Sequence, residues 1–141
     1  MIKIYTDGSC LENPGNGGWA AIIFMNNEKI IISGRKKNST NNQMELMAAI
    51  EALKKIPKDQ EVQMYTDSKY VKMGITEWIK KWSQNDWKTS SKQKVKNIEL
   101  WKELNDISKK HKIEWHWVKA HAGNPNNEEL GELAKKAANL N

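Results

Sequence analysis

Two stretches of this sequence share one feature: an alternating apolar pattern followed by Thr-Asp. Residues 1–10 read MIKIYTDGSC, in which Ile2 and Ile4 alternate towards Asp7. Residues 62–70 read VQMYTDSKY and bring Asp67 out of a similar run. An apolar period of two residues predicts a β-strand that is buried on one face. The chain is therefore expected to carry a carboxylate at the end of each of two strands, which constrains how those strands can be arranged.

The remaining elements follow from changes in the apolar period and from breaker residues. The expected strands are residues 1–10, 19–25, 29–34, 62–66 and 112–118. The expected helices are residues 42–55, 68–82, 95–109 and a last helix from about Pro125. The glycine-rich stretch LENPGNGG, residues 11–18, is interpreted as a turn. On the last strand, Trp115 and Trp117 are expected to face the core or to pack along the strand.

This order of elements predicts an α/β fold built on a five-stranded mixed sheet, with three antiparallel strands followed by two parallel ones and flanking helices. A helix between the third and fourth strands favours parallel pairing of the first and fourth. In sheets of this kind, ligands bind at the carboxyl ends of the strands, at a topological switch point. Asp7 and Asp67 are both expected at that edge.

Length and composition set limits on the class of protein. A chain of 141 residues is expected to form a single domain over residues 1–141. The sequence contains no apolar run long enough for a transmembrane helix, and because the first predicted strand begins within two residues, no signal peptide is expected. A single cysteine, Cys10, excludes an internal disulfide and favours a reducing compartment, so a cytoplasmic location is expected. A monomer is expected as well.

The positive charge is concentrated in one segment. The formal net charge is +6, and residues 78–102 hold seven lysines against two acidic residues. Basic residues interleaved with aromatic ones suggest a polyanionic partner, most often a nucleic acid. Because lysine acts as a point charge and Arg35 is the only arginine, the charge favours contact with phosphates rather than reading of bases. A solvated helical surface is the structural alternative.

The two strand-end aspartates suggest a metal site. Neighbouring strands lie about 4.8 Å apart, so Asp7 and Asp67 could share a cation, with Glu45 near the same edge in the first turn of a helix. Such oxygen ligands suit Mg²⁺, and a pair of ions about 3.5–4 Å apart can hydrolyse a phosphodiester. Each acid also has a structural explanation: Asp67 as a helix N-cap, Glu45 in a capping box with Asn42, and Asp7 as a turn residue.

At this point the sequence resembles the bacterial type 1 ribonuclease H family. The similarity covers nearly the whole chain, through the blocks YTDGSCLENPG, TNNQMELMAAIEAL, YTDSKYV, GITEWIKKW, WKTSSKQKVKN and WHWVKAHAGNPNNEELGELA. It implies an endonuclease that hydrolyses the RNA strand of RNA–DNA hybrids and leaves 5′-phosphate and 3′-hydroxyl ends. It also implies two Mg²⁺ ions per site, with Mn²⁺ as a possible substitute.

The resemblance assigns roles to particular residues. Asp7, Glu45 and Asp67 match three of four metal-binding carboxylates, and His121 matches a loop histidine that assists proton transfer or product release. The residues expected at the hybrid are the backbone near Cys10, Asn13, Asn41, Asn42 and Lys69, with Thr40 and Ser68 as weaker candidates for phosphate contacts. A basic protrusion at about residues 78–102 is expected on the DNA strand, through Lys80, Lys81, Trp82, Trp87, Lys88, Lys92, Lys94 and Lys96. Its tryptophans are expected mainly to pack its helices.

One position departs from the family pattern. The resemblance implies a fourth carboxylate where this chain has Gly131. A glycine within a helix destabilises it by about 1 kcal/mol relative to alanine, so helix stability does not explain it. Three explanations stay open: an aspartate-to-glycine change that disables catalysis, a neighbouring acid that substitutes, or a homologue that only binds hybrids. Glu128, three residues earlier on the same helical face, is the candidate substitute, although an acid there also complements the helix dipole.

Overall fold

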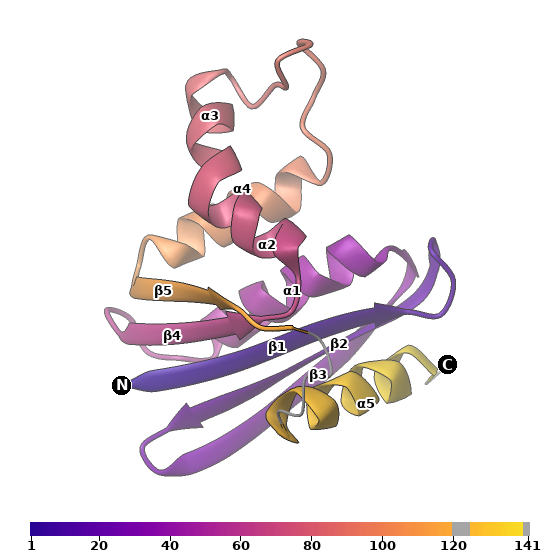
Figure 1. Cartoon of the computed structure of the whole chain (residues 1–141), viewed down its shortest axis with the longest axis vertical. Helices are drawn as coiled ribbons and strands as arrows, with labels where there is room; N and C mark the ends of the chain where they lie inside the picture. The colour runs from indigo at the N-terminus through magenta and orange to yellow at the C-terminus, as the bar shows by residue number, and fades with distance from the viewer. Residues whose placement is uncertain (120–124, 140–141) are drawn as a thin grey trace.

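The computed structural model describes residues 1–119 and 125–139, which form one sheet with helices on both faces (Figure 1). The strands are β1 Ile2–Cys10, β2 Gly15–Met25, β3 Glu28–Ser39, β4 Glu61–Thr66 and β5 Lys112–Trp117. The helices are α1 Asn41–Lys54, α2 Lys69–Met73, α3 Ile79–Gln84, α4 Ile98–Ser108 and α5 Pro125–Asn139, and a π-helical turn, η1 Gly74–Trp78, joins α2 to α3. Within these described ranges, no helix combines the length and the apolar character that crossing a membrane needs.

The sheet has the mixed topology that the sequence predicts. Its strand order is β3-β2-β1-β4-β5, with β1 antiparallel to β2, β2 antiparallel to β3, and β1, β4 and β5 parallel. Thr6 of β1 lies opposite Thr66 of β4 in the last pair of the β1–β4 ladder, so the residues that follow, Asp7 and Asp67, lie just beyond this ladder at the same edge. The expected α/β fold with a five-stranded mixed sheet is confirmed.

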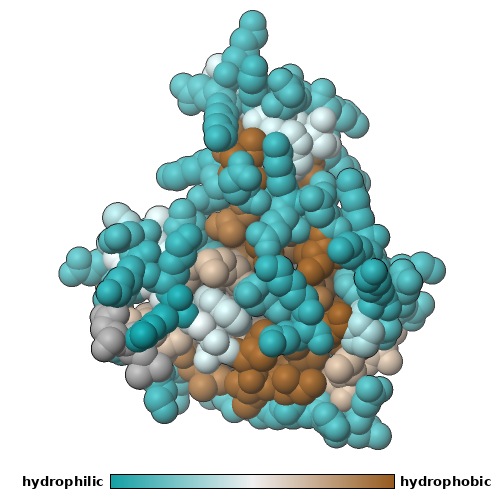
Figure 2. Space-filling view, turned by 180° about the vertical axis from the view of Figure 1, so that it is seen from behind, coloured by the Kyte–Doolittle hydropathy of each residue, from teal (hydrophilic) through white to brown (hydrophobic). Residues whose placement is uncertain are grey.

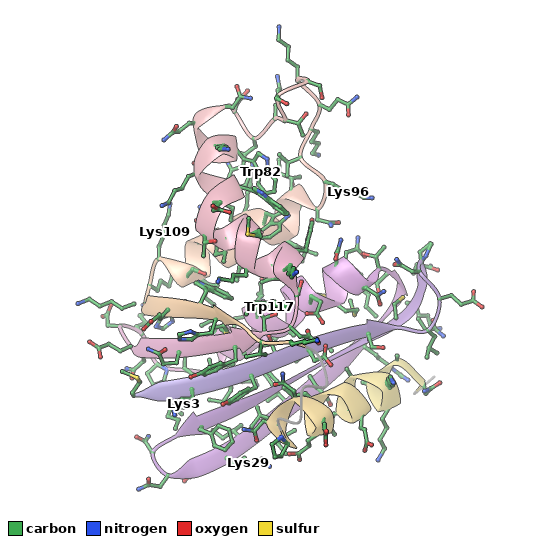
Figure 3. The ribbon with its side chains drawn as sticks, viewed as in Figure 1. Lys3, Lys29, Trp82, Lys96, Lys109 and Trp117 are labelled. Carbon is green, nitrogen blue, oxygen red and sulfur yellow. The ribbon has the colours of Figure 1, made fainter. Side chains whose placement is uncertain are left out.

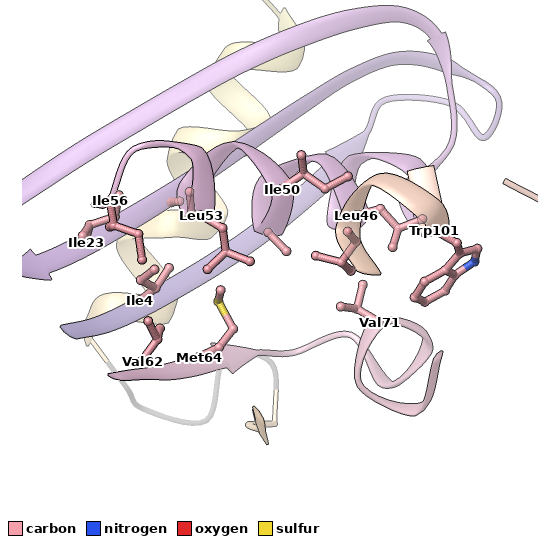
Figure 4. Close-up of a cluster of buried hydrophobic side chains, with 14 of the residues drawn as sticks. Ile4, Ile23, Leu46, Ile50, Leu53, Ile56, Val62, Met64, Val71 and Trp101 are labelled. Atoms are coloured by element: carbon pink, nitrogen blue, oxygen red, sulfur yellow. The ribbon is translucent and has the colours of Figure 1, made fainter. Parts of the chain in front are cut away.

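Each face of the sheet is covered by one long helix. On one face, Ile4, Ile23 and Met64 pack against Leu46 and Leu53 of α1 (Figure 4). On the other face, Ala20 and Ile22 of β2 pack against Leu130 and Ala134 of α5. Because side chains alternate along a strand, β1 sends Ile4 towards α1 and Asp7 towards the face that α5 covers. β1 therefore contributes Ile4 to the core and Asp7 to the sheet edge where Asp67 also lies.

Several predicted boundaries are wrong: the third strand, predicted to end at residue 34, continues to Ser39, and two others are wrong for identifiable reasons. β2 begins at Gly15, so the glycines interpreted as a turn lie in a strand, and Gly18 pairs with Ser9. A Cβ atom on Gly18 would collide with the α5 backbone at Ala134, so glycine here permits helix packing rather than a turn. The helix predicted to start at residue 95 starts at Ile98, because Asn97 has a left-handed backbone with a φ of 60°.

The π-helical turn η1 lies where the indole of Trp101 packs against the helix. Trp101 is fully buried, and a Cβ atom on Gly74 would overlap its ring. π-Turns widen a helix by one residue and appear mostly as local bulges. The helix from α2 to α3 thus stays continuous while it accommodates the largest side chain of the core.

Gly74→Ala is expected to lower the free energy of unfolding by about 1–3 kcal/mol, because the added methyl group overpacks the Trp101 site. Urea unfolding measures the change. Glu77→Ala, an exposed change in the same turn, serves as control and should stay within about 0.5 kcal/mol. Equal stability of Gly74→Ala and the parent protein would contradict the packing described here.

Candidate metal site and nucleic-acid surface

Three carboxylates meet at the carboxyl edge of the parallel strands. Asp7 lies in β1, Glu45 in the second turn of α1, and Asp67 directly after β4. Each offers a carboxylate oxygen, and these oxygens all lie within 4.8 Å of one another. Three acids that are far apart in the sequence are thus collected at one point by the parallel pairing of β1 with β4 and by the helix that crosses between them.

Gly8 allows α1 to approach β1 closely enough for Glu45 to join Asp7. A Cβ atom at this position would lie 2.5 Å from the backbone nitrogen of Glu45. The amide of Gly8 donates to Asp7 Oδ1 at 2.9 Å and also to Glu45 Oε1. Gly8 therefore has a packing role, and its amide is shared between Asp7 and Glu45.

The structural explanations for the three acids do not fit their surroundings. The capping box of α1 is formed by Thr40 and Gln43, which leaves the Glu45 side chain free of that role. The N-cap of α2 is Ser68, whose hydroxyl accepts from the Val71 amide at 3.1 Å, so Asp67 is not the cap. Asp7 pairs with Ala20 inside the β1–β2 ladder rather than in a turn.

Burial and mutual repulsion raise the pKa values of two of these carboxyls. Burial, followed by repulsion from Asp7 and Asp67, raises the pKa of Glu45 well above its ordinary value. Burial and then repulsion from Asp7 raise the pKa of Asp67 from 3.8 to about 6. Glu45 Oε2 is buried without a hydrogen-bond partner among the described residues. A cation at this point would relieve the repulsion and supply the missing partner.

The donor set fits a hard divalent cation. All of the clustered atoms are carboxylate oxygens, which Mg²⁺ and Ca²⁺ prefer, whereas zinc sites usually include histidine or cysteine. A few protein carboxylates, with other positions left for water and phosphate oxygens, are typical of Mg²⁺. The arrangement can therefore bring a cation and a phosphate group together at the sheet edge.

The loop after β1 and the start of α1 form one polar surface beside these acids. The Asn41 amide donates to Asn13 Oδ1 at 3.2 Å, and the Cys10 thiol donates to the Ser39 carbonyl at 3.1 Å. The side chains of Asn41 and Asn42 are exposed. Residues expected at the hybrid from two distant stretches are therefore neighbours. Thr40 and Ser68, the weaker candidates, use their hydroxyls as helix caps.

Of the two roles expected for Trp117, facing the core or packing along the strand, the structure excludes the first. Trp115 packs against the main core cluster, whereas Trp117 is 38 % exposed. Its indole nitrogen donates to the Asp67 carbonyl at 3.0 Å, and the Lys69 ammonium lies 4.8 Å from the centre of its ring. β5 extends past the core at this point, so Trp117, which continues the apolar alternation, lies beside Asp67 instead of in the interior.

The basic segment, residues 78–102, projects from the sheet and has an aromatic interior. Trp82 lies 5.8 Å from Trp78, 6.5 Å from Trp87 and 5.5 Å from Trp101, measured between ring centroids. The expectation that these tryptophans pack the helices is confirmed. Lys96 is one of the exposed lysines of the segment (Figure 3). All seven are exposed: Lys80, Lys81, Lys88, Lys92, Lys94, Lys96 and Lys102. Seen from behind, hydrophilic side chains dominate the projecting part, while hydrophobic surface gathers lower on the molecule (Figure 2).

Helix α5 brings Gly131 to the face of the sheet that carries Asp7. Gly131 is buried, and its helix neighbours Leu130 and Ala134 pack on Ala20, the residue that pairs with Asp7. Glu128 is exposed in the first turn of α5 and is not part of the carboxylate group found within the described ranges. His121 lies outside the described residues.

Sequence reasoning missed residues that hold the site together. Besides Gly8, the side chain of Gln43 donates to Asn97 Oδ1 at 3.2 Å, and Asn97 donates to the Tyr70 hydroxyl at 3.1 Å. This chain of hydrogen bonds ties the start of α1 to the base of the basic segment. The Thr40-x-x-Gln43 spacing is a recognisable capping-box signal, but no local pattern indicates the link to Asn97.

Comparisons with known proteins agree with this geometry. The family model described as RNase H matches residues 1–139. The chain is 56 % identical over 136 residues to a ribonuclease H of Wolbachia sp. subsp. Drosophila simulans, covering 96 % of this chain and 94 % of the relative. It is 57 % identical to that of Wolbachia pipientis wMel, with the same coverage. The crystal structure of LC9-RNase H1, a type 1 RNase H with the type 2 active-site motif, superposes with a TM-score of 0.85 at 31 % identity, covering 97 % and 71 % of the two chains.

Asp67→Asn is expected to stabilise the metal-free protein at pH 8. Because the pKa of Asp67 is raised to about 6 in the folded state, the folded protein binds this proton more tightly than the unfolded chain. Stability without metal should therefore fall as the pH rises from about 4 to 6 and stay lower above that range. Removing the charge should recover about 1 kcal/mol, after allowance for solvent screening.

Thermal unfolding in EDTA at pH 4 and pH 8 measures this effect. The variant should melt a few degrees higher than the parent at pH 8, and the difference should shrink at pH 4. Asp106→Asn, an exposed change on α4, is the matched control and should alter neither value. A lower melting temperature for Asp67→Asn at pH 8 would rule out the repulsion argued above.

Proposed function

The chain belongs to the ribonuclease H family, and we propose that it binds RNA–DNA hybrids and hydrolyses their RNA strand at Asp7, Glu45 and Asp67, with turnover reduced by Gly131. The observation that carries the proposal is the cluster of three carboxylates at the sheet edge, whose oxygens lie within 4.8 Å of one another. Within the described residues, Glu45 Oε2 of this cluster is buried without a hydrogen-bond partner. An acid buried in this way is costly unless a ligand compensates for it. A role in folding alone does not explain why a carboxylate is buried at Glu45.

The proposed cofactor is Mg²⁺, with Mn²⁺ as a possible substitute. Asp7, Glu45 and Asp67 would hold it, and a pair of such ions supplies an activated water and stabilises the leaving 3′-oxygen of the phosphodiester. Asp7 is proposed as the central residue, because its carboxylate lies with both others within 4.8 Å and, after burial, its charge is the next cause of the raised pKa values of Glu45 and Asp67. His121 is proposed to assist proton transfer or product release. The products would carry 5′-phosphate and 3′-hydroxyl ends.

The polar surface beside the acids is proposed to recognise the hybrid. Asn13, Asn41 and Asn42, with the backbone near Cys10, offer amide donors and acceptors at the start of α1. RNA is distinguished from DNA by its 2′-hydroxyls, which such groups can contact in a shallow minor groove. Lys69 is proposed to contact a phosphate. Thr40 and Ser68 contribute chiefly by fixing the helix starts that carry these groups.

The basic segment is proposed to hold the DNA strand. Its lysines are exposed around a packed tryptophan interior, and the Gln43–Asn97 hydrogen bond fixes its base relative to α1. Contacts between lysine and phosphate position a nucleic acid without reading its sequence. The partner is therefore proposed to be a hybrid of any sequence, bound by a cytoplasmic monomer.

Gly131 is proposed to occupy the position of a fourth metal-binding acid. Gly131 is buried on α5 beside Leu130, which packs on Ala20, the sheet partner of Asp7, and glycine offers no ligand there. We propose that Glu128 does not replace it, because its side chain is exposed outside the carboxylate group. A second candidate function follows from the same observation: a protein that binds hybrids without cleaving them.

Gly131→Asp is expected to increase Mg²⁺-dependent cleavage of a labelled RNA–DNA hybrid by at least about tenfold, which corresponds to about 1.4 kcal/mol of transition-state stabilisation. Single-turnover rates with Mg²⁺ and with Mn²⁺ measure the change. Gly131→Asn has nearly the same shape but no charge and should leave the rate near that of the parent. Glu128→Gln should also leave it unchanged.

The parent protein decides between the two candidate functions in the same assay. Measurable cleavage by the parent that is lost in Asp7→Asn supports the enzyme. Tight hybrid binding without cleavage, restored by Gly131→Asp, supports the binding protein. If Gly131→Asp has no effect on either metal dependence or rate, the role proposed for this position is wrong.

Replacing Lys80, Lys81 and Lys88 together by alanine is expected to weaken hybrid binding and to flatten its salt dependence. Each lost phosphate contact should reduce the slope of log K against log salt concentration by about 1, so the triple variant should lose up to about 3. Fluorescence anisotropy at several salt concentrations measures the slope.

The matched control removes the same charge elsewhere. Lys3, Lys58 and Lys112 are exposed near the amino ends of the parallel strands, opposite the carboxylate group. Their triple alanine variant should change the slope by less than the protrusion variant does. Equal slopes for the two triple variants would show that general charge, rather than the basic segment, governs binding.

A further inference from the structure

The parallel ladder that leads to the metal site ends one residue before Asp67. The last paired residues of β4 and β5 are Thr66 and Trp117, and the Val118 amide donates to the Thr66 carbonyl at 2.9 Å. Beyond this point β4 turns towards α2, and the next carbonyl along the chain is that of Asp67. A strand end of this kind leaves the following residue without a ladder partner from the main chain.

A side chain takes the place of the missing ladder bond. The indole nitrogen of Trp117 donates to the Asp67 carbonyl at 3.0 Å. On the other side, the Ser68 amide donates to Thr66 Oγ1 at 3.1 Å. The peptide units that flank the Asp67 side chain are therefore held by β5 and by the end of β4, in addition to the capped start of α2.

The position of Trp117 is not explained by burial. Its side chain is 38 % exposed, although Trp115, two residues earlier on the same face of β5, packs into the core. Its ring instead lies under the Lys69 ammonium, 4.8 Å from the centroid, which is the distance of a cation–π contact. One side chain thus contacts Asp67 through its N–H group and Lys69 through its ring.

We propose that Trp117 is a positioning residue that holds Asp67 for the metal and Lys69 for a phosphate of the hybrid. This inference rests on the proposed function, since it concerns the same site. Fixing a ligand through its neighbours matters because displacements of about 1 Å at a reacting centre can lower a rate about 100-fold. The two contacts of Trp117 connect metal binding and phosphate binding to one point at the end of β5.

Two substitutions separate the two contacts. Trp117→Phe keeps a ring beneath Lys69 but removes the N–H group that reaches Asp67. Lys69→Met keeps the length of the side chain but removes the ammonium. Trp115→Phe removes an indole from the same face of the same strand and is the matched control.

The first measurement is Mn²⁺ binding to the metal-free protein, followed by electron paramagnetic resonance. Loss of one hydrogen bond should raise the dissociation constant for Mn²⁺ about 3- to 10-fold in Trp117→Phe. The affinity for a hybrid in EDTA should change less than twofold in this variant. Lys69→Met should show the opposite pattern, with weaker hybrid binding and nearly unchanged Mn²⁺ binding. Trp115→Phe should alter neither.

The second measurement needs no metal. Hydrogen exchange of the Ser68 amide, which reports the backbone next to Asp67, should be about 3- to 10-fold faster in Trp117→Phe than in the parent or in Trp115→Phe. If Trp117→Phe does not fold, exchange of the Trp117 indole N–H in the parent decides, and it should be slower than that of the exposed backbone amides of the same protein.

The outcomes separate the inference from the proposed function. Unchanged Mn²⁺ affinity together with unchanged Ser68 exchange in Trp117→Phe would overturn the positioning role, as would an unprotected indole N–H in the parent. Absence of Mn²⁺ binding in the parent would instead overturn the proposed metal site, while Ser68 exchange would still test whether Trp117 holds Asp67.

Discussion

The close packing of α1 on β1 at Gly8 determines how near the carboxylates of Asp7 and Glu45 lie to each other. The backbone of α1 comes so near the strand that any side chain at Gly8 would meet the main chain of Glu45. This contact brings Glu45 to the other two carboxylates, and the Gly8 amide donates to both Asp7 and Glu45. Because α1 also fills the core with Leu46, Ile50 and Leu53, the hydrophobic energy of the helix holds an acid in a position that electrostatics alone would oppose.

The three carboxylates of Asp7, Glu45 and Asp67 therefore repel one another, and the packing of the rest of the fold holds them together. The raised pKa values of Glu45 and Asp67 share two causes, burial and the charge of Asp7. Local conflicts of this kind persist where surrounding packing over-determines the structure, and they concentrate at functional sites. The same reasoning explains why the site is built on strand ends and a buried helix rather than on a long loop, since a flexible segment would let the charges separate.

The parts of this architecture that depend on apolar periodicity could be predicted from the sequence. The strands before Asp7 and Asp67, and the helix that carries Glu45, follow from alternation and helical spacing, and the crossover helix implies the parallel pairing that unites them. Close approach could not be predicted in the same way. Gly18 looks like a turn residue but lies against α5, and Trp117 continues a core pattern beyond the point where the core ends. The positions of Gly18 and Trp117 both depend on contacts between segments that are distant in sequence.

The two charged regions of the molecule are connected through polar contacts rather than through the core alone. Gln43, three residues after the cap of α1, bonds to Asn97, and both Asn97 and the Trp101 indole donate to the Tyr70 hydroxyl. Tyr70 follows Lys69 on α2, so the base of the basic segment is joined to the helix starts on either side of the carboxylates. A duplex that contacts both regions would meet acids and lysines at a fixed separation. In the proposed function, that fixed separation would let the lysines hold one strand by its phosphates while the other strand lies at the three carboxylates.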